Sequence, residues 1–193
     1  MPLVPEFCIL LFLLQMLSST TKTNVMHTVT ATTPPQPRIS ALKTILLAWF
    51  TAGCLDLLAA VTVYSFIMKR VTSQRLLQGI ARGALGNSAY QGGTATALAG
   101  VGFHFIIAFC FTVFYFFIFP YIPFLKKQRV ISGLLYGIFV WCVMNLAVLP
   151  LLNISVIPTK WAPISRGAVI LMFCIGLPIS LIVSRYYLSK EIK

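Results

Sequence analysis

Four long apolar stretches divide the chain, and each predicts a helix long enough to cross a membrane. They cover residues 44–68, 94–119, 131–152 and 164–183. Residues 94–119 are the clearest, because these 26 positions contain no Asp, Glu, Lys or Arg. At about 1.5 Å per helical residue they exceed a hydrocarbon layer of about 30 Å. The pattern predicts an all-α integral membrane bundle of four transmembrane helices in residues 39–193.

Residues 72–87 follow a different pattern, in which apolar and polar side chains fall on opposite sides of a helix. The apolar side is Leu76, Leu77, Ile80, Ala81, Ala84 and Leu85, and the polar side is Gln74, Gln78 and Arg82. We expect a short amphipathic helix that begins at Thr72 or Ser73 and ends at Gly86. Either it lies in the membrane interface, with Arg75 and Arg82 as interfacial basic residues, or it is a solvated connector packed on the ends of the bundle.

Small residues recur at four-residue steps in the second and third spans, which places them on one helix face. Such faces let helix backbones approach closely in membranes. The helix-packing residues predicted in this way are Gly92, Gly93, Thr96, Gly100, Gly133 and Gly137. In the fourth span Gly176 and Pro178 predict a kink or a local unwinding, and Pro150 is expected to kink or end the third span.

Residues 1–38 form a separate segment, made of an apolar stretch at 3–17 and a Thr- and Pro-rich linker. The apolar stretch has no Lys or Arg before it, and Glu6 stands where a signal peptide has a basic region. Two interpretations remain: a weak signal or anchor, or a start codon assigned too early with Met26 as the first residue. We expect the mature protein to lack most of residues 1–25.

Composition excludes a soluble domain, since 59% of residues are apolar and only 9% are charged, against about 25% charged in soluble domains. The net charge of +12 comes from basic residues at the ends of the apolar runs, where they anchor the spans in the lipid bilayer and meet anionic head groups. We therefore predict no nucleic-acid partner. Eight Lys and Arg on the side of the termini against six on the other side favour cytoplasmic termini.

Asp56, His104 and Asn145 place an ionisable group or a carboxamide well inside the spans, and counting from the span midpoints puts them at similar depth. They form either a proton or ion site or a set of hydrogen bonds that locks the bundle. An enzyme using an unmarked serine with His104 is a third interpretation. The sequence carries no catalytic motif, and its five cysteines fall in separate segments without a Cys-x-x-Cys, so no metal or cofactor is predicted.

Several series of residues carry a family resemblance. They are Ala52-Gly53-x-Leu55-Asp56, Gly92-Gly93-x-Ala95-Thr96-Ala97-Leu98, His104-Phe-Ile-Ile-Ala-Phe109, Tyr115, Gly133-Leu-Leu-Tyr-Gly137 and Met144-Asn145-Leu-x-Val148-Leu-Pro150. Over residues 40–185 the chain resembles a group of small bacterial inner-membrane proteins and, more loosely, YagU-type membrane proteins. The resemblance implies a location in the bacterial inner (cytoplasmic) membrane and no particular activity. It leaves out residues 1–38, which favours a start near Met26.

The functional prediction is accordingly a multi-pass membrane protein with a structural or accessory-subunit role. The alternatives are a small proton- or ion-linked transporter or channel component and an intramembrane enzyme. A homo-oligomer or another membrane protein is the expected protein partner.

Overall fold

Helices make up the protein in the computed structural model, which describes residues 40–152 and 161–191. They are α2 (Ala41–Val61), α3 (Ser73–Leu85), α4 (Gly93–Ile118), α5 (Pro123–Lys127), α6 (Arg129–Val143), α7 (Leu149–Leu151), α8 (Trp161–Leu171) and α9 (Leu177–Glu191). The described residues contain no strand and belong to one unit, 39–193. The predictions for residues 1–38, Met26 included, lie outside the described residues.

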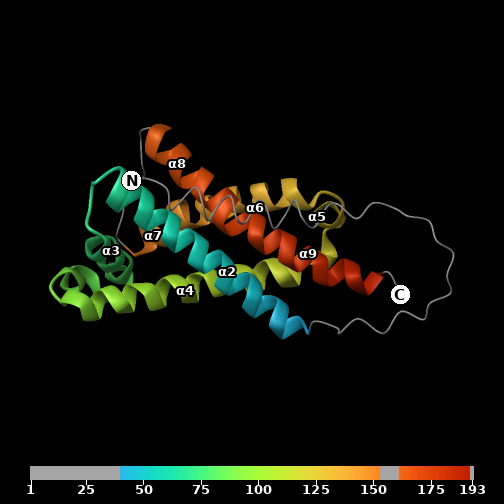
Figure 1. The fold of residues 1–193 in the computed structure, drawn as a ribbon, viewed down its shortest axis with the longest axis horizontal. Coiled ribbons are helices and arrows are strands. Elements are labelled where there is room, and N and C mark those ends of the chain that lie inside the picture. Colours follow the sequence, from blue (N-terminus) through green and yellow to red (C-terminus); the bar gives the residue numbers. More distant parts are fainter. Residues whose placement is uncertain (1–39, 153–160, 192–193) are drawn as a thin grey trace. The chain divides into compact units, whose positions relative to one another are not determined.

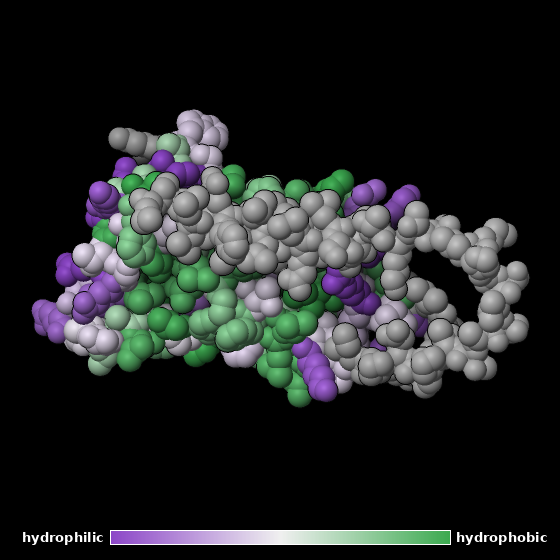
Figure 2. Space-filling model, viewed as in Figure 1, coloured by the Kyte–Doolittle hydropathy of each residue, from purple (hydrophilic) through white to green (hydrophobic). Residues whose placement is uncertain are grey.

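Four of the helical stretches are long and apolar enough to cross a membrane, as predicted. They are Ala41–Ile67, Gly93–Tyr121, Arg129–Leu151 and Trp161–Lys190. Successive stretches run in opposite directions, and the last one, formed by α8 and α9, packs against both α2 and α6 (Figure 1). Among the coloured residues of the visible face, hydrophobic ones fill the middle, and hydrophilic ones gather toward the two ends (Figure 2). This distribution is typical of a multi-pass membrane protein.

Three π-helical segments widen the long helices. They are Thr62–Ile67 after α2, Met144–Val148 after α6 and Met172–Gly176 between α8 and α9. π-Helical turns are rare and occur frequently at functional sites. Their positions therefore mark parts of the spans where function is expected.

Prolines explain two of the three π-helical segments. A proline ring inside a helix clashes with the carbonyl group four residues earlier. For Pro150 this residue is Leu146 and for Pro178 it is Cys174, and each is the middle residue of a π-helical segment. The wider turn accommodates the clash, so both helices continue through their prolines. The local unwinding expected near Pro178 is thus a π-helical segment, and the third span continues past Pro150 to Leu151.

The aromatic helix α4 is bonded to each of the other three spans through its backbone. Carbonyl groups on three of its turns accept hydrogen bonds from long side chains of the neighbouring helices. Trp49 Nε1 of α2 donates to Phe105 O at 2.7 Å, Tyr136 Oη of α6 to Phe111 O at 2.6 Å, and Tyr187 Oη of α9 to Phe116 O at 3.0 Å. Interhelical hydrogen bonds of this kind contribute about 0.6 kcal/mol each in membrane bundles.

Glycines hold α6 directly against the fourth span. A Cβ atom added at Gly137 would lie 2.6 Å from both Leu171 O and Met172 N, and one added at Gly133 would lie 3.0 Å from Gly176 O. A Cβ atom on Gly176 would in turn lie 2.6 Å from Gly137 N. These backbones therefore touch, and van der Waals contact between them stabilises the pair. We call this contact the glycine seam.

A buried group of hydroxyls lies beyond the seam, toward the end of the bundle that holds α5. Tyr115 Oη donates to Ser180 Oγ at 2.8 Å, and Ser180 Oγ donates to Arg129 O at 2.7 Å. Ser132 Oγ donates to the same carbonyl at 3.0 Å. Each of the three hydroxyl protons thus has an acceptor, which makes this polar group stable in an apolar core.

Helix α3 has the ends that the sequence predicts. Thr72 is its N-cap and accepts a hydrogen bond from Arg75 N at 3.2 Å. Gly86 ends it with φ +65°, a left-handed conformation that costs glycine little.

The packing of α3 corrects one part of the prediction. Gln78 was expected on the polar side, but it is only 4% exposed and donates from Nε2 to Gly93 O at 2.9 Å and to Thr96 Oγ1 at 3.4 Å. Gly100 lies against the backbone of Leu77, so α3 packs along the first turns of α4. The prediction failed because the buried hydrogen bonds at the α4 terminus compensate the cost of burying an amide. The interfacial position of α3 stays a prediction.

Candidate functional site

A cavity of about 260 Å³ opens between α2, α6 and α8. It contains both polar and apolar side chains. Its lining residues are Asp56, Ala60, Tyr64, Trp141, Asn145, Pro163, Gly167, Ile170 and Leu171.

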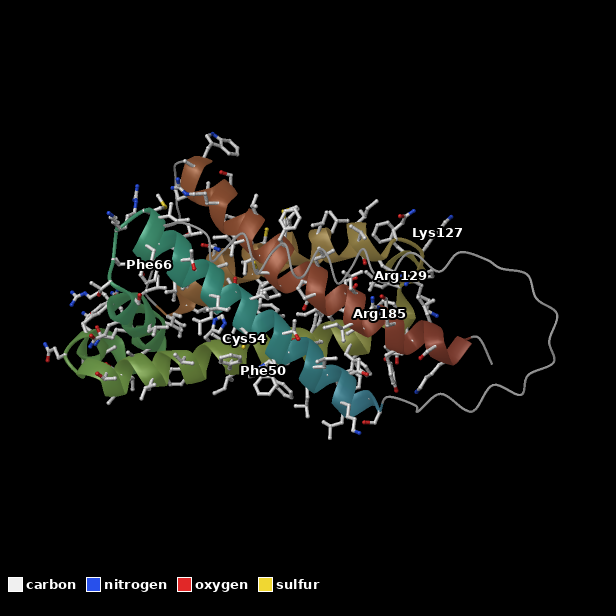
Figure 3. All side chains as sticks on the ribbon, viewed as in Figure 1. Phe50, Cys54, Phe66, Lys127, Arg129 and Arg185 are labelled. Atoms are coloured by element: carbon white, nitrogen blue, oxygen red, sulfur yellow. The ribbon has the colours of Figure 1, made fainter. Side chains whose placement is uncertain are left out.

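The cavity runs from the middle of α2 toward the end of the bundle that lies opposite the described termini. Asp56, Ala60 and Tyr64 follow one another at four-residue steps, so they line about 12 Å of the helix on one side. In Figure 3, Cys54 marks the middle of α2, and Phe66 marks the end toward which this row of residues runs. Asp56 is therefore the deep residue of the row and Tyr64 the outer one.

Asp56 is half-buried, and its carboxylate accepts no hydrogen bond from any residue that the structure describes. No ion pair joins the carboxylate to another residue that the structure describes. A carboxylate in a membrane span is costly unless it is paired or reaches a water-filled space. The Asp56 carboxylate is therefore able to accept hydrogen bonds from a molecule that enters the cavity.

His104 is placed differently from the sequence-based expectation of a shared site. It is not among the residues that line the cavity, and its Nε2 atom lies 3.0 Å from Gly53 O on α2. A carbonyl oxygen can only accept, so Nε2 carries the proton and donates it. The ring also packs edge-on against Phe105, at 5.5 Å between the ring centroids. His104 thus ties α4 to α2 beside Asp56.

Asn145 lies in the cavity wall, on the π-helical segment Met144–Val148. Its Nδ2 atom donates to Trp141 O, one turn earlier on its own helix, at 2.9 Å. The structure therefore brings Asp56 and Asn145 to one cavity and His104 to its edge. No hydrogen bond joins any two of these three described residues.

Two aromatic residues complete the polar part of the wall, and sequence reasoning did not select them as site residues. Tyr64 lies two helical turns beyond Asp56, and this spacing was the available signal. Trp141 also lines the cavity, and its Nε1 atom is 2.9 Å from where a Cβ atom of Gly167 would be. The structure records no hydrogen bond for the Tyr64 hydroxyl or the Trp141 indole among the residues it describes.

Two buried polar atoms belong to residues next in sequence to lining residues. Ser65 Oγ follows Tyr64 along the chain and Arg166 Nε precedes Gly167, and neither has a hydrogen-bond partner among the described residues. Buried polar atoms are normally paired, so these two are exceptions.

Basic residues occupy both ends of the bundle. On α3, the Arg75 guanidinium lies 4.4 Å from the centroid of the Tyr90 ring, and Arg82 lies in the last turn. At the opposite end Lys127, Arg129 and Arg185 lie near one another (Figure 3). Neither group belongs to the cavity wall, so we assign both to the ends of the bundle.

A comparison of the chain with models of protein families, with curated proteins and with solved structures finds no match. The resemblance to bacterial inner-membrane proteins therefore stays a prediction.

Proposed function

We propose that this protein is a small proton- or cation-linked transporter or channel component, in which Asp56 takes up the proton or cation. The observation that carries the proposal is the Asp56 carboxylate, which lines a cavity at the middle of a span and accepts no hydrogen bond from a described residue. Intramembrane carboxylates in such positions typically mark ion and proton pathways.

The hydrogen bonds around Asp56 favour this function over a purely structural lock. A lock requires the polar residues of different helices to bond to one another. Here His104 donates to a backbone carbonyl of α2, and Asn145 donates to a carbonyl of its own helix. Neither bond depends on the Asp56 side chain, so the carboxylate is not needed to hold these helices together.

The π-helical segments support a site that changes conformation. Tyr64 lies in Thr62–Ile67, Asn145 lies in Met144–Val148, and Leu171 directly precedes Met172–Gly176. Two π-helical segments therefore contribute lining residues, and the third begins directly after one. π-Helical turns occur frequently at functional sites, and this position at the cavity wall supports a part of the structure that opens and closes.

Flux measurements in reconstituted vesicles test the proposal. Under a pH gradient, wild-type vesicles should show proton flux above empty liposomes, and Asp56→Asn should abolish it because an amide cannot carry the proton. Glu191→Gln, at the last residue of α9, makes the same chemical change away from the cavity and should keep the flux. Absence of wild-type flux above empty liposomes would refute the proposal and leave the accessory-subunit prediction in place.

Orientation and location form a separate part of the proposal. The resemblance and the excess of basic residues near the termini support the bacterial inner membrane, with both termini in the cytoplasm and anionic lipid head groups at the basic ends. On this orientation the outer end of the cavity, at Tyr64, lies toward the periplasm. Reporter fusions after Lys127 and after Lys160 should report cytoplasmic and periplasmic positions respectively; the reverse result would overturn the orientation and leave the cavity unchanged.

A further inference from the structure

We propose that the cavity binds a small monovalent organic cation, an alkylated ammonium ion. This inference rests on the proposed function and names the chemical class of its substrate. Among the residues that the structure describes, the lining contains one carboxylate, Asp56, and no Lys or Arg, so this part of the wall offers a single negative charge. Arg166 lies next to the lining residue Gly167 but is not itself part of the wall.

Aromatic side chains give the wall a second attraction for a cation. Trp141 and Tyr64 both line the cavity, from α6 and from the π-helical segment after α2. The negative faces of such rings attract ammonium groups, most strongly where water is excluded, and tryptophan is the most effective ring. Together with Asp56 they provide a carboxylate and two rings, which is a common way of recognising alkylated ammonium ions.

The rest of the wall favours an organic cation over an inorganic one. Hard metal ions require about six or more oxygen ligands, whereas the described lining residues supply side-chain oxygens from Asp56, Asn145 and Tyr64. The other lining residues include Ala60, Pro163, Ile170 and Leu171. These apolar side chains cannot replace the hydration shell of a metal ion, but they make favourable contact with methyl and ethyl groups.

Cavity size limits the ligand to a small one. Water occupies about 30 Å³ per molecule in the liquid, so 260 Å³ corresponds to roughly nine waters. Pockets for drug-sized ligands start at about 300 Å³. An ammonium ion with short alkyl groups fits this space, whereas a large lipophilic cation does not.

Calorimetric titration of the purified full-length protein with tetramethylammonium chloride tests the inference. We expect saturable binding in excess of that of sodium chloride at the same ionic strength. The neutral tert-butyl alcohol, which has a similar shape and no charge, should not bind measurably. Asp56→Asn should weaken tetramethylammonium binding at least about 30-fold, because the organic cation loses its charge partner.

Aromatic variants distinguish a specific cavity from general attraction by charge. Trp141→Leu should weaken binding about 30-fold and Trp141→Phe less, because phenylalanine keeps a ring face. Trp161→Leu removes a tryptophan that is 85% exposed and outside the cavity, and should change nothing. Circular dichroism checks that each variant folds, and if Trp141→Leu does not fold, Tyr64→Leu is used in its place with the same expected direction.

Two results would overturn the inference: no wild-type binding of tetramethylammonium, or binding that Asp56→Asn and the aromatic variants leave unchanged. Neither result decides the proton flux, which is measured separately in vesicles. Flux without tetramethylammonium binding would refute the organic cation alone. Binding without flux would refute the transport proposal and leave the cation site standing.

Discussion

Replacing Gly137 with alanine should open the glycine seam between α6 and the fourth span. The added Cβ atom would lie 2.6 Å from Leu171 O and from Met172 N, both of which are backbone atoms. Backbone atoms cannot rotate away as the end of a flexible side chain does. The two helices therefore have to move apart to accommodate a single methyl group.

The size of the effect follows from that movement. Ordinary contact begins at 3.4 Å, so Leu171 O and Met172 N alone require the backbones to separate by at least about 0.8 Å, and Met172 Cα lies closer still. A gap of this size forfeits about a quarter to a half of the attraction at each atomic contact along the seam. Lipid chains are as apolar as the helices and supply no compensating hydrophobic force. We expect the free energy of unfolding to fall by about 2–3 kcal/mol, at the upper end of the usual cost of overpacking.

Equilibrium unfolding in mixed micelles, followed by helical circular dichroism, measures this loss. Gly102→Ala is the matched control, because a Cβ atom there has no neighbour within 4 Å. That variant should be equally stable or gain up to about 1 kcal/mol from the higher helix propensity of alanine. If Gly137→Ala unfolds at the same detergent fraction as Gly102→Ala, the conclusion that the two backbones touch at the seam is wrong.

Three further variants test other parts of the structure. Asp56→Leu should fold with stability within about 1 kcal/mol of wild type, because no described hydrogen bond depends on the carboxylate; a loss of 3 kcal/mol or more in the same unfolding assay would show that it is paired. Tyr115→Phe should cost about 1 kcal/mol by removing the buried donor to Ser180, whereas Tyr121→Phe, at 82% exposure, should cost nothing measurable. Gln78→Leu should release α3 from Gly93 O and raise amide hydrogen exchange in α3 without lowering protection in α6; unchanged exchange in α3 would contradict its docking.

The four spans could be predicted because length and freedom from charge are sufficient signals for a membrane helix. The shared depth of Asp56 and Asn145 followed from counting residues along those spans. Which way each side chain faces could not be predicted in the same manner, because these helices are apolar on nearly all sides and carry little information about their rotation. For this reason the sequence did not show that His104 bonds to the α2 backbone and lies outside the cavity wall.

The cavity was harder to predict from the sequence than the spans. Pro150 and Pro178 signalled altered helices, but a sequence pattern does not specify that the adjustment is π-helical. Gly176 was expected to unwind the fourth span, whereas it also forms one side of the glycine seam. The shape of a cavity depends on side chains from three helices at once. A local sequence pattern gives no information about how these side chains pack together.

The bonding of α4 has an evolutionary consequence. Its three interhelical acceptors at Phe105, Phe111 and Phe116 are main-chain carbonyls, which no substitution on α4 removes. Only the donors on the other helices can be lost by mutation. In descendants of this protein the side chains at Phe105, Phe111 and Phe116 can therefore change without removing these three acceptors, whereas Trp49, Tyr136 and Tyr187 cannot be replaced without losing a donor.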